Sequence, residues 1–288
     1  MEILFRTEIQ KFMLAKLLLT LLCVMTCLYA GCVVNPLTGA DEFMLFPPEQ
    51  DVEIGKAYSV EVEKQLGGRI ENDALQEYIT AVGRKMASIS HRADIEYHFT
   101  ALNDESVNAF ALPGGYIFIT KGLLEKFRTE AQLAAILSHE IVHVVARDTA
   151  NTMSKDIGTS LLLVVAIMAN VSQGAVTAGQ VTQQIIGLRY SREDEREADL
   201  GGLTYMVRAG YDPSAMVEVM QTLQSLNDER PPEFFATHPS PLNRLTYIER
   251  RIKQRYAGVS GLRVGKEEYE RAVLSQLKSA KRPSAPSR

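Results

Sequence analysis

His139-Glu140-Ile141-Val142-His143 is the stretch of sequence on which the interpretation of this chain depends. On a helix, side chains four positions apart lie on one face, with their β-carbons about 5–6 Å apart. His139 and His143 can therefore hold one metal ion between them, with the Glu140 carboxylate beside the first imidazole. The chain has 5 histidines among its 288 residues, so this spacing rarely arises by accident. The alternative is an ordinary amphipathic helix that carries two solvated histidines.

The sequence around this stretch has the features of a helix. Thr129 and Gln132 form a T-x-x-Q capping box, which places the helix start at about Glu130. Apolar residues then recur at helical spacing, and neither Gly nor Pro occurs before Arg147. Neutral imidazole is the commonest protein ligand of zinc, and H-E-x-x-H supplies two ligands and a base in zinc metalloproteases. We therefore expect a half-buried zinc site at the floor of a groove, with one coordination position open.

A catalytic zinc needs a third protein ligand. A histidine six residues after His143 would complete one arrangement, but that position is Thr149. The alternative is a carboxylate from a second helix, and residues 190–199 contain several. Glu195 and Asp199 are four positions apart, so both point the same way. One can bind the metal while the other accepts a hydrogen bond from a ligand histidine.

The two stretches together resemble a known family. H-E-x-x-H followed by S-R-x-x-E-x-x-A-D is similar to the zinc metallopeptidases related to HtpX and the CaaX prenyl protease, a gluzincin group. The resemblance implies one zinc per chain, with Glu195 as the third ligand and Asp199 behind a ligand histidine. Glu193 and Glu197 are local competitors, but neither has an Asp four residues further on. The alternative for this segment is a solvated acidic helix start, stabilised by the helix dipole.

Residues 108–119 read as a β-hairpin around a Pro-Gly-Gly turn. By the resemblance, the Asn-Ala-aromatic strand forms the edge of a small antiparallel sheet beside the zinc groove. An edge strand presents unpaired N–H and C=O groups, to which an extended peptide can add as a further strand. Asn108 and Ala109 are therefore expected to contact the substrate backbone. An ordinary core hairpin is the alternative.

Residues 237–244 match the T-H-P-x-x-x-x-R stretch of the same family. Ser240 before Pro241 indicates an N-cap and a helix start, so the simple alternative is that His238 only precedes a helix. The resemblance places His238 near the zinc, as an oxyanion stabiliser or as a reversible fourth ligand that would inhibit the resting enzyme. Arg244 is expected to stabilise charge in the transition state.

The first 32 residues read as a secretory leader. The apolar run over residues 17–28 is short for a membrane span, and residues 29–32 resemble a lipobox. Cys32 is thus expected to be the acylated N-terminus of an exported lipoprotein, and Val33 after it favours the outer membrane. A plain membrane anchor is the alternative. Translation from Met13 would give a more typical leader.

The rest of the chain fits one α+β domain that is mostly helical. We expect a tether over residues 33–50, a gluzincin-type metallopeptidase domain over 51–279 and a disordered tail over 280–288. Two or three strands are expected between 95 and 120. Helices are expected over 49–66, 72–90, 121–147, 193–209, 213–227, 241–256 and 265–279.

Three further features limit the interpretation. Gly201 and Gly202, inside an expected helix, predict close packing against the H-E-x-x-H helix. The apolar segment 157–169 is too short to cross a bilayer and is expected to pack on the domain or beside the groove, or else to dip into the membrane surface. The net charge of −4, without a basic run outside the tail, argues against nucleic acid as a partner.

The resemblance and the leader together predict a zinc-dependent endopeptidase, with Glu140 as general base on a metal-activated water. Its expected substrates are unfolded or misassembled envelope proteins at the periplasmic side of the outer membrane, to which Cys32 would attach it. Outer-membrane assembly machinery is a candidate partner. The main alternative is an assembly factor or chaperone that uses the same groove without obligatory proteolysis. Prenyl-protein processing inside the membrane is a weaker third interpretation.

Overall fold

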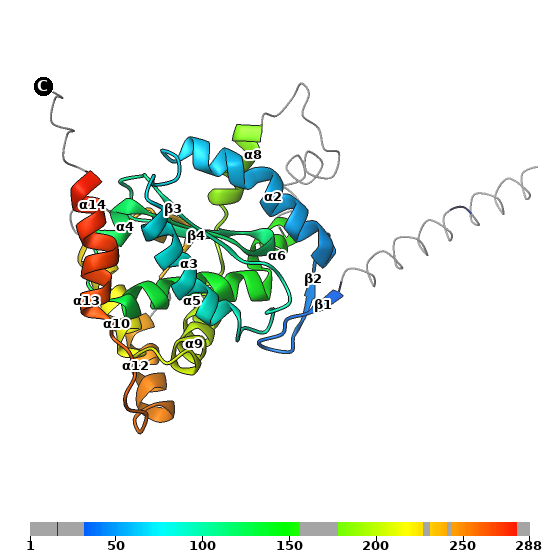
Figure 1. Ribbon diagram of the computed structural model, residues 1–288. Helices are drawn as coiled ribbons and strands as arrows, with labels where there is room; N and C mark the ends of the chain where they lie inside the picture. Colours follow the sequence, from blue (N-terminus) through cyan, green and yellow to red (C-terminus); the bar gives the residue numbers. More distant parts are fainter. Residues whose placement is uncertain (1–15, 17–31, 156–177, 227–230, 241–242, 281–288) are drawn as a thin grey trace, which may run out of the picture.

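The computed structural model describes residue 16 and residues 32–155, 178–226, 231–240 and 243–280 (Figure 1). Most of the expected leader, the apolar segment 157–169 and the tail after residue 280 lie outside the described residues. No helix in the described ranges is long and apolar enough to cross a membrane.

The H-E-x-x-H helix, α5 (Glu130–Ala146), runs through the middle of the domain, and all its residues are buried. The predicted capping box is present, because Thr129 accepts from the Gln132 backbone N–H and the Gln132 side chain accepts from the Thr129 N–H. The sequence predicted a half-buried metal site at the floor of a groove, whereas in the structure every residue of α5, including His139 and His143, is buried. Strand β4 packs on one side, and α3, α9 and α10 pack on the others.

Three short strands form the main sheet, in the order β3-β5-β4. They are β3 (His98–Leu102), β4 (Ala109–Leu112) and β5 (Tyr116–Thr120). The predicted hairpin is β4 and β5, joined by the 3₁₀ turn η1 (Pro113–Gly115). The sheet is mixed rather than wholly antiparallel, since β3 pairs with β5 in parallel. Strand β4 lies at an edge and contacts α5, as expected.

Helices cover the remaining sides of α5 and of the sheet. The expected helix 121–147 is two elements, because α4 (Lys121–Leu124) ends before the capping box. The helix expected over 241–256 is α12 (Arg244–Arg255). It begins at Arg244 because Asn243, directly before it, has a left-handed backbone (φ 61°). The other expected helices are α3 (Asp73–Ala87), α9 (Arg192–Arg208), α10 (Ser214–Leu226), α13 (Lys266–Tyr269), the π-helical turn η2 (Glu270–Leu274) and α14 (Ser275–Ala280). The sequence did not predict α6 (Asp148–Lys155), α8 (Ala178–Ile186) or α11 (Phe234–Thr237).

Helix α9 packs closely against α5, as its two adjacent glycines predicted. A β-carbon on Gly201 would lie 2.8 Å from Val142 Cγ2, and one on Gly202 would lie 3.1 Å from Ser138 Oγ. These contacts are tighter than side chains normally allow, so only glycine lets the two helices approach this closely. The approach brings the start of α9 over the two histidines of α5.

The N-terminal segment packs on the domain, although the sequence analysis treated residues 33–50 as a tether. It contains the antiparallel pair β1 (Cys32–Val34) and β2 (Asp41–Phe43), followed by α2 (Pro48–Gln65). Asn35 Nδ2 donates to Glu42 Oε1 (2.8 Å) and to Glu197 Oε1 on α9 (2.9 Å). The Leu45 N–H donates to Ser154 Oγ on α6 (2.9 Å). This segment is therefore part of the folded unit.

Helix α2 also holds the β4–β5 hairpin through a close contact at Gly55. A β-carbon there would lie 2.2 Å from the Pro113 carbonyl oxygen and 2.4 Å from Tyr116 Cδ2. We predict that Gly55→Ala lowers the free energy of unfolding by about 1–3 kcal/mol, measured by urea denaturation, because the hairpin must shift. Gly258→Ala is the control, since nothing lies within 4 Å of its β-carbon. A Gly55→Ala protein as stable as the control would contradict this packing argument.

Candidate metal centre

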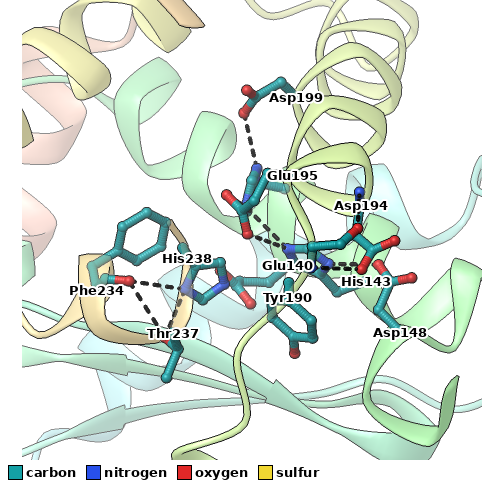
Figure 2. A network of polar contacts seen from close by, with 12 residues as sticks. Glu140, His143, Asp148, Tyr190, Asp194, Glu195, Asp199, Phe234, Thr237 and His238 are labelled. Carbon is teal, nitrogen blue, oxygen red and sulfur yellow. Dashed lines mark hydrogen bonds and ion pairs between the residues drawn. The ribbon is translucent and has the colours of Figure 1, made fainter. Parts of the chain in front are cut away.

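Four side chains from three parts of the chain meet beside the middle of α5. The ligand atoms of His139, His143, Glu195 and His238 all lie within 4.8 Å of one another, and all four residues are buried. Helix α5 supplies the first two, α9 supplies Glu195, and His238 directly follows α11. Figure 2 shows His238 and Glu195 approaching Glu140 and His143 from different sides.

Each of the three imidazoles turns its Nε2 atom toward this cluster. His139 Nδ1 lies 3.1 Å from Asp199 Oδ1, and His143 Nδ1 lies 2.7 Å from Asp148 Oδ2. His238 Nδ1 lies 3.2 Å from the carbonyl oxygen of Phe234. An acceptor beside Nδ1 favours the tautomer with the proton on that atom, which leaves the Nε2 lone pair free to bind a metal.

Burial keeps these imidazoles neutral, which is the form that binds metals. It lowers the pKa of His139 and of His143 to about 3, and it lowers the pKa of His238 well below its usual value. His139 Nε2 and His143 Nε2 lie only 3.1 Å apart. With the proton of each ring on Nδ1, the Nε2 lone pairs of the two neutral imidazoles face each other and repel. A cation bound between them would remove the repulsion.

The distances within the cluster fit a tetrahedral zinc site. Glu195 Oε2 lies 3.7 Å from His139 Nε2, and Glu195 Oε1 lies 3.6 Å from His143 Nε2. Zinc binds nitrogen and oxygen at about 2.0–2.2 Å, which places tetrahedral ligands about 3.3–3.6 Å apart. Small side-chain movements would therefore suffice for the two imidazoles and the carboxylate to share one ion.

Two buried carboxylates in the cluster lack hydrogen bonds. Neither oxygen of Glu140 or of Glu195 has a hydrogen-bond partner among the described residues. Burial raises the pKa of Glu140 to about 8 and raises that of Glu195 well above its usual value. A nearby divalent cation would reverse both shifts, because positive charge favours the ionised form. Buried carboxylates without hydrogen bonds are costly, so this arrangement favours a cation at the centre.

Asp199 and Arg244 form a buried ion pair next to the cluster. Arg244 Nε and Nη2 lie 2.8 and 2.7 Å from the two oxygens of Asp199, and the Tyr247 hydroxyl donates to the same carboxylate. Arg244 Nη1 lies 3.2 Å from Glu195 Oε2. Burial alone would raise the pKa of Asp199, but Arg244 and His139 hold it below its usual value. The guanidinium of Arg244 thus faces two carboxylates of α9.

The two predicted substrate-contacting residues lie at the start of the edge strand, and both are buried. The Asn108 N–H donates to Thr120 Oγ1 at 3.0 Å, and the Asn108 carbonyl accepts from the Thr120 backbone N–H at 3.0 Å. Backbone groups alternate in direction along a strand, so those of Ala109 and Ala111 face away from β5. The Asn108 side-chain oxygen is buried and has no partner among the described residues. The backbone of Asn108 is thus used within the hairpin, whereas the backbone groups of Ala109 point away from it.

Three residues around the centre escaped the sequence analysis. Asp148 orients His143 although it is five positions further on, and Tyr190 stacks on the His143 ring at 4.0 Å between centroids. The ring of Phe234 stacks on His238 at 4.1 Å. Tyr190 is the first residue of the stretch 190–199, but nothing in the sequence gave it a role there. No sequence pattern points to Asp148 or Phe234.

Known proteins share this arrangement of motifs. The chain is 29% identical over 231 residues to the beta-barrel assembly-enhancing protease of Escherichia coli, an alignment that covers 72% of this chain and 47% of that protein. It is 32% identical over 202 residues to a putative beta-barrel assembly-enhancing protease of Vibrio cholerae (64% and 40%). A mitochondrial metalloendopeptidase of Arabidopsis thaliana is 33% identical over 154 residues (54% and 31%). The chain thus spans half or less of the length of these curated relatives.

A family model also matches this chain. The model described as Peptidase family M48 covers residues 73–252, which include α5, α9 and the segment around His238. The match confirms the resemblance to gluzincin metallopeptidases and the mostly helical α+β fold that it implied. Because the matched region is more than half of the sequence, the chain belongs to Peptidase family M48.

Proposed function

We propose that this protein is a zinc-dependent endopeptidase whose metal is held by His139, His143 and Glu195. The convergence of these three buried side chains with His238, and the absence of hydrogen bonds to the oxygens of Glu140 and Glu195 among the described residues, is the observation that carries the proposal. When bound, zinc would act as a Lewis acid that acidifies a water and polarises the scissile carbonyl. Asp199 and Asp148 hold two of the imidazoles in the tautomer that this role needs.

Glu140 is the proposed general base. It follows the first histidine, its side chain is buried in the cluster, and its two oxygens have no hydrogen-bond partner among the described residues. It would accept the proton of the attacking water and then deliver it to the leaving amine, so no covalent intermediate is needed. Strand β4 would align the peptide through the outward backbone groups around Ala109.

The proposed substrates are unfolded or misassembled envelope proteins. Two relatives are named as beta-barrel assembly-enhancing proteases, and the leader of this chain predicts export with a lipid anchor at Cys32 on the periplasmic side of the outer membrane. An extended peptide on an edge strand is bound through its backbone, which suits substrates without a fixed sequence. Because the names of these relatives include "assembly-enhancing", the second candidate function is assistance of protein assembly without proteolysis.

We predict that Glu140→Gln keeps zinc but loses proteolysis, because the amide cannot accept the proton, whereas all three ligands remain. His139→Ala should lose both zinc and activity. Metal analysis and cleavage of an unfolded test protein measure the two effects. Cleavage by Glu140→Gln at the wild-type rate would refute the general-base assignment.

The same variant separates the two candidate functions. If assembly help without proteolysis is the main role, a Glu140→Gln gene should still complement a deletion strain. If proteolysis is required, complementation should fail although the protein folds and binds zinc.

His238 is proposed to close the centre as a reversible fourth ligand. It is fully buried, and its Nε2 lies 3.5 Å from Glu140 Oε1, where the attacking water would have to sit. We predict that His238→Ala raises the basal rate of peptide cleavage, measured with a short unstructured peptide. An unchanged or lower rate would favour the oxyanion role instead.

Arg244 is proposed to position Asp199 and Glu195 rather than to contact the transition state. Arg244→Met would leave two buried carboxylates without their cation, so the metal-free protein should lose about 3–5 kcal/mol of stability in urea denaturation. Arg250→Met, on the exposed face of the same helix, is the control and should change stability by less than about 0.5 kcal/mol. Equal stability of the two variants would contradict the positioning role.

A further inference from the structure

Asp148 reaches His143 because the chain turns sharply between α5 and α6. In an uninterrupted α-helix, residue i+5 lies about 140° around the axis from residue i, so its carboxylate would point away. Asp148 Oδ2 instead lies 2.7 Å from His143 Nδ1. Figure 2 shows the two side chains next to each other. The turn therefore creates this contact.

Arg147 makes the turn with an unfavourable backbone. Its φ of 61° and ψ of 34° place it in the left-handed region, where helices commonly end on glycine. Asn243 is the only other non-glycine residue with positive φ among the described residues. Because a long side chain at such a position is strained, the interactions of that side chain have to offset the cost.

The N-terminal segment supplies these interactions. Arg147 Nε lies 2.6 Å from Asp51 Oδ2, and Nη2 lies 2.9 Å from Asp51 Oδ1, so the pair is bidentate. Arg147 Nη2 also donates to the carbonyl oxygen of Phe46 at 2.8 Å. Asp51 lies in the first turn of α2, and both partners are buried.

Arg92 ties the same carboxylate to the end of α5. Its Nη1 lies 3.4 Å from Asp51 Oδ2 and 3.3 Å from the carbonyl oxygen of Val144, in the last turn of that helix. Asp51 thus joins the last turn of α5, the turn residue Arg147 and the segment after α3.

We propose that Asp51 and Arg147 are positioning residues for the metal centre. Their ion pair fixes the turn after α5, and the turn holds Asp148 against His143. The proposal rests on the proposed function in that His143 is taken as a metal ligand. Asp51 precedes residue 73, where the match to the peptidase family begins, so part of this support comes from outside the matched region.

The first test is zinc release from Asp51→Asn in the purified full chain. The amide keeps the size of the side chain but weakens the pair, so His143 should lose its fixed orientation. We expect zinc to pass to a chelator about ten- to a hundred-fold faster than from the wild type, because the loss of a residue behind a metal ligand typically costs that factor in metal affinity.

Glu130→Gln is the matched control, because Glu130 begins helix α5, whereas the Asp51–Arg147 pair lies at the end of α5. Glu130 is buried and bound by Arg263 in the same bidentate way, at 2.6 and 2.9 Å. Its loss should lower the melting temperature but leave zinc release unchanged. If Asp51→Asn also lowers only the melting temperature, the pair is merely structural and the proposal is wrong.

Arg147→Gly separates the side chain from the backbone strain. Glycine adopts positive φ freely, so this variant should fold even if Asp51→Asn does not. Without the guanidinium, its turn is no longer anchored, and zinc release should be as fast as from Asp51→Asn. Arg147→Lys, which keeps the charge but not the bidentate geometry, should release zinc at a rate between those of the wild type and Arg147→Gly. Wild-type release from Arg147→Gly would overturn the proposal.

A measurement on the metal-free protein keeps this proposal separate from the proposed function. Nitrogen NMR of the His143 ring should show one fixed tautomer in the wild type and in Glu130→Gln, but exchange between tautomers in Asp51→Asn and Arg147→Gly. If the wild type binds no zinc, the proposed function fails and this ring measurement still decides the positioning role. An unchanged ring in both variants would refute it.

Discussion

The close packing of α5 against α9 is the constraint on which the rest of the structure depends. Each helix carries a pair of polar residues four positions apart, and neither pair can form a metal site alone. Gly201 and Gly202 remove the side chains that would separate the helices. As a result, the Glu195 oxygens come within 3.6–3.7 Å of the Nε2 atoms of both histidines. A displacement of α9 away from α5 would lengthen these distances further beyond the roughly 3.3–3.6 Å that separate tetrahedral zinc ligands.

The three buried carboxylates of the centre, Glu140, Glu195 and Asp199, differ in how their negative charge is compensated. Asp199 is fully satisfied by His139, Arg244 and Tyr247, so it stays ionised without a metal. Glu195 forms an ion pair with Arg244 Nη1 but no hydrogen bond among the described residues, and Glu140 likewise has no hydrogen bond there. The negative charge of Asp199 is thus balanced by Arg244 without a metal. Glu140 and Glu195, which face the cluster, are left to interact with a cation at the centre. This difference supports the roles proposed for them.

The sequence predicted those parts of the site that follow from the helical period. His139 with His143, and Glu195 with Asp199, are local pairs, and the capping box at Thr129 marks where their helix begins. Asp148 could not be found this way, because its contact depends on a left-handed backbone at an arginine, where sequence rules expect glycine. The Asp51–Arg147 pair joins residues 96 positions apart. The parallel pairing of β3 with β5 likewise depends on long-range packing, which periodicity does not report.

The short α11 segment lies at one side of the centre, because His238 directly follows it. On the proposed function, entry of a peptide would displace this segment, since α5 and α9 are fixed by their mutual packing. Backbone bonds that join the segment to other described residues include Phe234 N–H to the Val107 carbonyl (3.2 Å) and Tyr190 N–H to the Thr237 carbonyl (3.1 Å). Val107 directly precedes the edge strand. A peptide that pairs with β4 would therefore approach the same backbone that holds α11 in place, so on the proposed function substrate binding would be coupled to the release of His238.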